Sequence, residues 1–498
     1  MEFDVWSLEF DLKFEVWFLV FLMMKTQILL STLLLAPLLG FSQEWESLFD
    51  GKSLTGWKAS EAADSFKVSD GQIVCDGARS HLFYVGTGAK AEFKNFELSA
   101  EVMTHNGANS GIYFHTAFQE RGFPGQGFEV QVLNRRPTTG NYRENKLTGS
   151  LYAIHNVYKP LVKDDEWFTL RIAVRGKNVQ VRVNDQLVVD YVEPDPAPDV
   201  PGHSARKLGH GTFALQCHDA QSKTCFRNLR VRRLPDDLRD APAPAPAMSD
   251  YEQQIIRLGA ANYPVVNYHV HLKGGLTLEQ ALASSRQTGI FYGIAINCGL
   301  NFSVTNDAGI DDYLNSMRGQ PCFVAMQAEG REWVNLFSRQ AISRFDYVFT
   351  DAMTIFDDQG RRMRLWIPAE VPPITDQQAF MDMLVDRTVK ILENEPIDVY
   401  VNPTFLPAQI AAEYDQLWSE ARMRKVVSAA AARQIAIEIN SRYRLPGLPF
   451  IKLAKAAGCK FTFGTNNGDR DVGRLDYAFQ MIREAGLEWQ DIWLPKPK

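Results

Sequence analysis

Two hydrophobic patterns divide the chain. Over residues 45–234, apolar and polar residues alternate in short runs separated by turn residues, which is typical of antiparallel strands. From residue 251 onward, short apolar runs alternate with helical stretches, which is typical of a parallel fold built from strand–helix units. The patterns predict an all-β sandwich or jelly roll at residues 44–234 and an α/β barrel-like domain at residues 251–498.

The alternating runs locate the individual elements. The first region has strand candidates at residues 96–103, 109–115, 127–134, 168–174, 179–183, 187–192, 211–217 and 226–231. The second has seven strand candidates, at residues 265–272, 291–298, 322–328, 347–354, 398–402, 434–440 and 460–464. Helices are predicted at residues 278–285, 377–392, 411–433, 449–457 and 474–485. Thr277 with Gln280, and Thr375 with Gln378, have the spacing of a capping box at two of these helix starts.

Two segments outside the domains have their own composition. Residues 235–250 contain an Ala-Pro repeat, which favours extended geometry and predicts a semi-rigid linker. Residues 24–42 combine a short positive region, an apolar run and a small final residue, which is the pattern of a secretory signal peptide with the mature start near Gln43. Residues 1–23 precede that pattern, so they indicate either a mis-called start at Met1 or an amphipathic extension. We expect a secreted or periplasmic protein.

Charge and cysteine content narrow the function classes. The net charge of −6, with no Lys/Arg block, gives no reason to expect nucleic acid. The apolar run at residues 28–39 is too short for a stable membrane span. Six cysteines are few for a disulfide scaffold, although Cys217 and Cys225 flank a turn and either bridge a hairpin or remain free thiols.

One predicted sheet face carries chemically active side chains. In the strands at 109–115 and 127–134, Ile112, Phe114 and Val130 share the apolar face. The opposite face is predicted to carry Tyr113, His115, Glu129 and Gln131, and the strand at 211–217 adds Gln216 and then His218 with the same parity. This face is either a polar sheet surface open to solvent or a site.

Four motifs in the first region carry a family resemblance. The stretch WESLFDGKSLTGW at residues 45–57, NSGIYF at 109–114, GFEVQVL at 127–133, and the closing LQ through FRNLRV at 215–231 resemble the 3-keto-disaccharide hydrolase domain family. The resemblance covers residues 44–234 and implies a concanavalin-like jelly roll. It also implies activity on 3-keto-glycosides. This sequence has His115 where the family often has Arg, and Asn134 where it commonly has Asp.

The implied reaction matches the polar face. A ketone at C3 acidifies the C2 hydrogen, so a base, a donor for the enolate oxygen and an acid for the leaving group suffice. We assign Glu129 as the base, and His218 or His115 as proton donor or enolate stabiliser. Predicted substrate contacts are Gln131, Tyr113, Gln216, Asn109 and Tyr152. A metal held by these groups remains an alternative, since His and Glu are suitable ligands.

The second region has a different candidate site. His269 and His271 lie two residues apart on its first strand, so both can face one metal ion, and Glu329, Asp351 and Glu438 lie near later strand ends. The pattern resembles the polymerase and histidinol phosphatase superfamily over residues 260–490, which implies a seven-stranded distorted, TIM-like barrel with a divalent metal. Two departures, Val-Asn-Pro at 401–403 and Thr-Asn-Asn-Gly at 465–468, remove expected ligands, so the barrel is either a metal site or degenerate.

Three functional readings follow from the sequence. The first is a secreted hydrolase or lyase that cleaves the glycosidic bond of 3-keto-glycosides in the sandwich, with the barrel as an accessory domain. The second is a carbohydrate-binding protein without catalysis. The third is a metal-dependent hydrolase that acts through the barrel. We expect a carbohydrate partner and no nucleotide cofactor.

Overall fold

The computed structural model describes residues 44–86, 91–137, 143–238 and 240–496. Trp45–Lys498 forms one compact unit, which contains both predicted domains. The predicted signal peptide, the mature start near Gln43 and the question of the start codon lie outside the described residues. No helix in the described ranges combines the length and apolar character needed to cross a bilayer.

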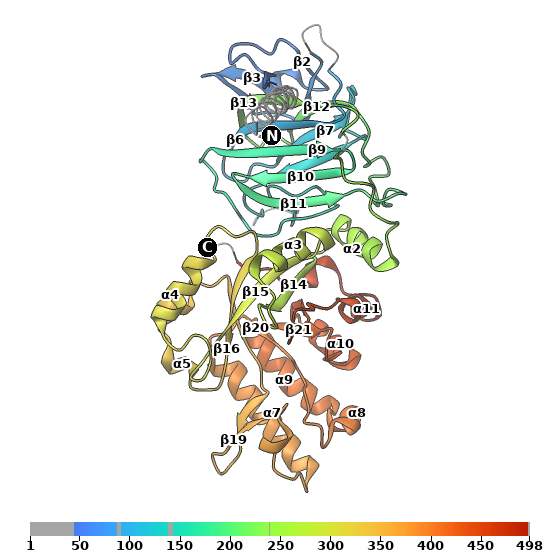
Figure 1. The fold of residues 1–498 in the computed structure, drawn as a ribbon. Coiled ribbons are helices and arrows are strands. Elements are labelled where there is room, and N and C mark those ends of the chain that lie inside the picture. The colour runs from blue at the N-terminus through green and yellow to red at the C-terminus, as the bar shows by residue number, and fades with distance from the viewer. Residues whose placement is uncertain (1–43, 87–90, 138–142, 239, 497–498) are drawn as a thin grey trace, which may run out of the picture. The chain divides into compact units, whose positions relative to one another are not determined.

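The N-terminal half is a sandwich of two antiparallel sheets, as predicted (Figure 1). The larger sheet has the order β11 (Gln186–Val192), β10 (Asn178–Val183), β9 (Phe168–Arg175), β6 (Phe96–Thr104), β13 (Thr224–Arg233), β4 (Gln72–Cys75) and β3 (Phe66–Ser69), with β1 (Glu46–Ser47) paired to β13. The smaller sheet has the order β2 (Trp57–Ala59), β5 (Ser80–Tyr84), β12 (Thr212–Cys217), β7 (Ser110–Thr116) and β8 (Phe128–Val132).

The smaller sheet is buried on both faces. Ile112, Phe114 and Val130 belong to the sandwich core, as their parity predicts. On the opposite face, Tyr113 and Gln216 are each 1% exposed and Glu129 is 5% exposed. The alternative of a polar sheet surface open to solvent is therefore wrong, because this face is covered by other parts of the protein.

The C-terminal half contains a closed barrel of seven parallel strands, which confirms the predicted number and direction of the strands; its likeness to a TIM barrel stays a prediction. Its strands are β14 (Val266–His271), β15 (Phe291–Cys298), β16 (Phe323–Ala328), β17 (Tyr347–Thr350), β20 (Val399–Tyr400), β21 (Ala436–Asn440) and β22 (Phe461–Gly464). The helices between and around them include α2 (Asp250–Ala260), α3 (Leu278–Thr288), α4 (Asp307–Ser316), α7 (Gln377–Asn394), α9 (Glu420–Ala432), α10 (Leu448–Ala456) and α11 (Asp476–Glu484). A hairpin, β18 (Thr354–Phe356) and β19 (Arg362–Arg364), follows β17.

Local capping corrects two helix predictions. The capping box of Thr277 and Gln280 is confirmed. The next predicted box is wrong, because Asp376 rather than Thr375 caps α7. The single helix predicted at 411–433 is instead a short turn of helix, α8 (Tyr414–Leu417), followed by α9, because Ser419 caps a new helix start.

The predicted linker is extended and is held by the sandwich. Ala245 forms a parallel bridge with Pro194, just after β11. Its amide donates to the carbonyl of Glu193 at 3.3 Å, and its carbonyl accepts from Asp195 at 3.2 Å. The Ala-Pro segment is therefore hydrogen-bonded to the sandwich at Ala245.

Sandwich and barrel share packing within this unit. One hydrophobic cluster contains core residues of both, and the Tyr158 ring packs edge-on against Phe291 at the start of β15. Lys159 donates to Asp346, which lies just before β17, at 2.8 Å. The contacts with the sandwich are therefore made at the end of the barrel where its strands begin.

Candidate functional site

Glu129 lies on β8, directly opposite Tyr113 of β7 in the antiparallel register. Its side chain points away from the sandwich core and crosses Gly111, where an added Cβ would lie 2.5 Å from Oε1. A glycine at position 111 therefore makes the space that the carboxylate occupies. Strand pairing and this missing side chain together fix where Glu129 points.

Three polar side chains surround the Glu129 carboxylate. Nη2 of Arg206 donates to Oε2 at 3.3 Å, and Nε2 of Gln216 lies 3.3 Å from Oε1. The same Gln216 nitrogen lies 3.0 Å from the Tyr113 hydroxyl. Burial raises the pKa of Glu129, although the charge of Arg206 opposes this. The structure thus brings together Glu129, Tyr113 and Gln216 as predicted, and adds Arg206.

This cluster keeps unused hydrogen-bonding capacity. Within the described residues, Nε and Nη1 of Arg206, Oε1 of Gln216 and Nδ1 of His81 are buried without a hydrogen-bond partner. Buried polar atoms in folded proteins nearly always have partners, so unpaired donors and acceptors beside a carboxylate favour a site that a polar ligand or water completes.

His218 lies close to this cluster, just after β12. Its Nδ1 is 2.7 Å from Oδ2 of Asp219, and its side chain is 20% exposed. Asp219 is itself held, since it accepts from the Gln221 amide at 2.8 Å. A carboxylate on Nδ1 orients the imidazole, so Nε2 is the atom suited to proton exchange. The Phe123 ring lies 5.7 Å from the His218 ring and 5.6 Å from the His81 ring, so His218 is on the His81 side of the cluster.

Two further predicted contacts form a pair beside Glu129. Nε2 of Gln131 donates to Oδ1 of Asn109 at 3.0 Å. The backbone amide of Asn109 donates to Oγ of Ser222 at 3.0 Å, and Ser222 belongs to the same loop as Asp219. Gln131 and Asn109 therefore connect β8 to the loop that holds His218.

The Tyr152 ring packs against the Arg206 guanidinium. The Arg206 guanidinium lies 5.2 Å from the centre of the Tyr152 ring, and Nζ of Lys146 lies 4.6 Å from it. The Tyr152 hydroxyl donates to Glu144 at 2.9 Å, and Glu144 pairs with Lys146 at 2.8 Å. Arg206, Lys146 and Glu144 are site residues that the sequence did not reveal, because they lie outside regular strands.

Asn262, from the barrel half, bonds to the Lys146 side chain that packs on Tyr152. Oδ1 of Asn262, two residues after α2, accepts from Nζ of Lys146 at 3.1 Å and from the Asn145 amide at 3.0 Å. The contacts therefore run from Asn262 through Lys146 and Tyr152 to Arg206 and the Glu129 carboxylate.

His115 does not join the site, which corrects the prediction. Its φ of 55° breaks the strand alternation, and its ring packs against Phe96 and Phe114. Nδ1 accepts from the Gly209 amide at 3.2 Å, so Nε2 carries the proton and donates to the carbonyl of Lys94 at 2.9 Å. Burial lowers the pKa of His115 to about 4, so the ring is a neutral structural group.

Two other sequence features also prove structural. Asn134 donates to Thr104 and accepts from Thr148, both at 2.6 Å, so its amide is used in packing. Cys217 and Cys225 are buried free thiols rather than a disulfide.

The predicted metal ligands of the barrel bond to other protein groups. Nδ1 of His269 lies 2.7 Å from Oε1 of Glu438, and its Nε2 lies 3.3 Å from Gln327. Nδ1 of His271 lies 3.2 Å from the carbonyl of Ala295. Asn297 donates to Glu329 at 2.6 Å, and Asn402 lies 3.3 Å from Asp351.

The metal site of the barrel stays a prediction. The described part of the chain contains no group of three or more His, Cys, Asp or Glu side chains placed to hold an ion. Both nitrogens of His269 lie against protein groups, Glu438 and Gln327. Nε2 of His271, in contrast, is buried without a hydrogen-bond partner among the described residues.

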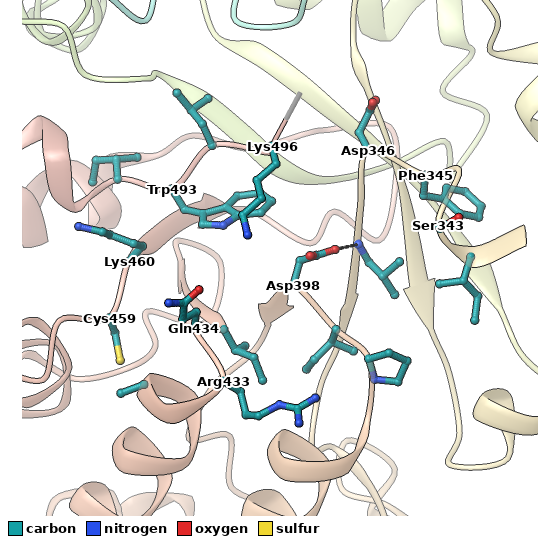
Figure 2. Close-up of a pocket in the computed structure, with 18 of the residues that line it drawn as sticks. Ser343, Phe345, Asp346, Asp398, Arg433, Gln434, Cys459, Lys460, Trp493 and Lys496 are labelled. Carbon is teal, nitrogen blue, oxygen red and sulfur yellow. Dashed lines mark hydrogen bonds between the residues drawn. The ribbon is translucent and has the colours of Figure 1, made fainter. Parts of the chain in front are cut away.

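A cavity of about 940 Å³ lies where several barrel strands begin (Figure 2). The two carboxylates that line it accept hydrogen bonds from backbone amides. Asp398 accepts from the Val348 amide at 2.8 Å, and Asp346 accepts from the Val324 amide at 2.7 Å. Because both acids fasten neighbouring strands, this end of the barrel serves stability.

Comparisons with known proteins bear on the sandwich. Residues 44–232 match the model of a 3-keto-alpha-glucoside-1,2-lyase-like domain. No curated protein matches the chain. Similar solved structures include two from Parabacteroides distasonis, provisionally described as glycosyl hydrolases. One is 21% identical, covers 38% of this chain and 94% of its own, and has a TM-score of 0.33. The other is 24% identical, covers 38% and 100%, and has a TM-score of 0.32.

A third similar structure is the carbohydrate-binding module CBM66 from Bacillus subtilis. It is 13% identical, covers 36% of this chain and 95% of its own, and has a TM-score of 0.25. The resemblance of residues 260–490 to the polymerase and histidinol phosphatase superfamily stays a prediction. What the comparisons establish is that the sandwich, at residues 44–232, is similar to a 3-keto-alpha-glucoside-1,2-lyase-like domain.

Proposed function

We propose that the sandwich cleaves the glycosidic bond of 3-keto-glycosides. The observation that carries the proposal is the Glu129 carboxylate, buried at 5% exposure and held by Arg206 and Gln216. The match of residues 44–232 to a lyase-like domain for 3-keto glucosides supports the substrate class. The signal-peptide pattern at residues 24–42 supports action outside the cytoplasm.

Each step has a group suited to it. Glu129 takes the proton from C2, the C2–H electrons form the enolate, and the negative charge develops on the C3 oxygen. The Arg206 guanidinium, whose Nε and Nη1 have no partner among the described residues, stabilises that charge. The C1–O bond then breaks as the enolate collapses to a C1–C2 double bond, and His218 gives a proton to the departing oxygen. Addition of water across this double bond completes a net hydrolysis.

Access to Glu129 is part of the proposal. The Glu129 side chain is only 7% exposed, whereas Phe123 is 45% exposed and its ring lies 5.6 Å from His81 and 5.7 Å from His218. We infer that substrate enters by displacing the loop between β7 and β8 that carries Phe123. A sugar on this side would meet His218 first and Glu129 next.

The direct test is turnover of a 3-keto-disaccharide by the full chain. We expect wild-type protein to release the free second sugar, and Glu129→Gln to lower kcat by about 10²–10⁴-fold, the usual contribution of a general base. Glu166→Gln is the matched control, because Glu166 is an exposed carboxylate before β9. Saturable binding without turnover in the wild type would replace catalysis with a carbohydrate-binding function.

A further inference from the structure

A second cavity, of about 570 Å³, opens at the other end of the barrel, where the strands finish. Amides and carboxylates from several strands line it, including Asn297, Gln327, Glu329, Asp351, Asn402 and Asn466. In barrels of this kind, side chains at the carboxyl ends of strands form functional sites. The volume lies within the range of small-molecule pockets.

The polar groups of this cavity hold one another in place. Asn297 on β15 donates to Glu329, just after β16, at 2.6 Å. Nδ2 of Asn402 donates to Oδ2 of Asp351 at 3.3 Å, and Oδ1 of Asn402 accepts from Nδ2 of Asn466 at 3.2 Å. Amide–carboxylate pairs of this kind fix hydrogen-bonding groups before a ligand arrives, which lowers the entropic cost of binding.

The barrel interior beneath the cavity is polar as well. Asn267, Glu438 and Asn440 are each at most 1% exposed, and Nε2 of His271 is buried without a partner among the described residues. A barrel kept only for packing fills its interior with layers of branched aliphatic side chains. Asn267, Glu438 and Asn440 bond to other protein groups. A buried nitrogen without a partner among the described residues, as at His271, favours a ligand at this end.

Aromatic rings stand at the same cavity. Trp366 and Tyr443 are 39% and 38% exposed, and Phe302 also lines the cavity. A sugar ring has apolar C–H faces and a polar hydroxyl edge. A cavity that combines exposed aromatic rings with fixed amides and carboxylates presents both kinds of partner.

Charged groups of both signs line the cavity. Lys273 and Arg442 lie there together with Glu329 and Asp351, so the formal charges are equal in number. A further cation, Arg364, is already paired with Glu370 at 2.7 Å. Equal numbers of the two signs suit a ligand without net charge.

From these observations we propose that this cavity is a binding site for a neutral mono- or disaccharide. The amides and carboxylates receive the hydroxyl edge, and Trp366 stacks on the C–H face. The proposal does not rest on the chemistry of the sandwich, because every group it uses belongs to the barrel.

The test titrates the full chain with D-glucose, D-galactose, sucrose and trehalose, using saturation-transfer NMR and calorimetry. We expect at least one sugar to bind with a Kd of about 1 mM or tighter. Trp366→Ala and Asn297→Ala should each weaken that binding by about tenfold or more, or about 1.4 kcal/mol. Trp45→Ala, which removes an exposed aromatic ring of the sandwich, and Glu166→Gln, which changes an exposed carboxylate, should leave it unchanged.

Several outcomes would overturn this proposal. They are no binding by any sugar at about 10 mM, or binding that Glu129→Gln abolishes and Trp366→Ala spares. Glucose 6-phosphate binding about tenfold tighter than glucose would make the ligand an anion, and loss of binding in EDTA would make the site metal-dependent. Because turnover in the sandwich is assayed separately, failure of either proposal leaves the other intact.

Discussion

The sandwich face and the mouth of the barrel use similar residue types in opposite ways. In the sandwich, one carboxylate, Glu129, is closed in beside Arg206, and several polar atoms around it lack partners. At the barrel mouth, Glu329 and Asp351 are held by amides and line an open cavity. The first arrangement has unused donors but little room, whereas the second has room and fixed hydrogen bonds.

This difference separates chemistry from binding. A buried carboxylate whose pKa is raised, next to a cation with unused donors, suits proton abstraction and charge stabilisation. Fixed amides around an open cavity suit recognition of a ligand that keeps its covalent structure. His269 and His271 do not change this difference, because Nδ1 of His269 lies 2.7 Å from Oε1 of Glu438 and is held by that carboxylate.

The largest expected effect tests whether His269 is structural. Its ring is buried and bonds to Glu438, whose carboxylate also accepts from the Asn402 backbone amide at 2.8 Å and from Asn440 at 3.1 Å. Losing a buried ring together with one buried hydrogen bond typically costs about 3–5 kcal/mol. We expect His269→Ala to lower the free energy of unfolding by that amount in urea denaturation. Both His269 and Glu438 have side chains that are only 1% exposed, so solvent cannot replace the lost partner.

The control for this variant is His210→Ala, since the His210 side chain is 67% exposed. Equal stability of the two variants would contradict the structural role of His269 and its hydrogen bond to Glu438. A metal-dependent loss of stability in wild type on adding EDTA would also contradict it.

The alternation of side chains along strands allowed part of the sandwich site to be predicted from the sequence. Because side chains alternate with a period of two, Tyr113, Glu129 and Gln216 could be assigned to one face before their contacts were known. The same rule failed at His115, where a left-handed φ of 55° turns the side chain toward Phe96. A single departure from strand geometry reverses which face a residue serves.

Long-range partners could not be predicted. Arg206 lies in the loop between β11 and β12, 77 positions from Glu129, and no periodicity connects the two. In the barrel, the His-x-His spacing correctly placed His269 and His271 on the same side of β14, where both rings are buried. It did not reveal that Glu438 binds His269 directly, because that depends on the arrangement of β14, β21 and β22.

The second prediction tests the neutral structural role of His115 through pH. Its folded pKa of about 4 lies below the ordinary 6.5, so the unfolded state binds more protons between these values. Stability should therefore fall as pH drops from about 6.5 to about 4, by up to about 3 kcal/mol from this residue. His115→Gln should show a shallower loss of unfolding free energy over that range.

The His115→Gln variant should keep turnover of the 3-keto-disaccharide at neutral pH within about threefold of wild type. A loss of kcat as large as that of Glu129→Gln would return His115 to the catalytic group. His105→Gln is the control for the pH effect, because the His105 side chain is 35% exposed.

The third prediction concerns charge stabilisation in the sandwich. Arg206→Met keeps much of the side-chain volume but removes the guanidinium beside Glu129. We expect kcat/KM for the 3-keto-disaccharide to fall by about 10²-fold, the scale of losing a preorganised donor. Arg206→Lys should recover part of this. Arg171→Met, at an arginine of the larger sheet whose side chain is 48% exposed, should be neutral, and an equal loss there would rule out a specific role for Arg206.

The smallest effect tests whether the barrel helps to form the sandwich site. Asn262 has a φ of 66°, so Asn262→Gly removes its side chain without backbone strain. Lys146 then loses an acceptor, and the Tyr152 ring that carries Arg206 loses a fixed neighbour. We expect kcat to fall by about tenfold with little change in KM, because a small misplacement of Arg206 affects the transition state more than substrate binding. Asn262→Asp, which keeps an oxygen acceptor for Lys146, should restore most of the rate. If Asn262→Gly lowers Tm but leaves kcat unchanged, the contact between barrel and sandwich is only structural, and the two halves act independently.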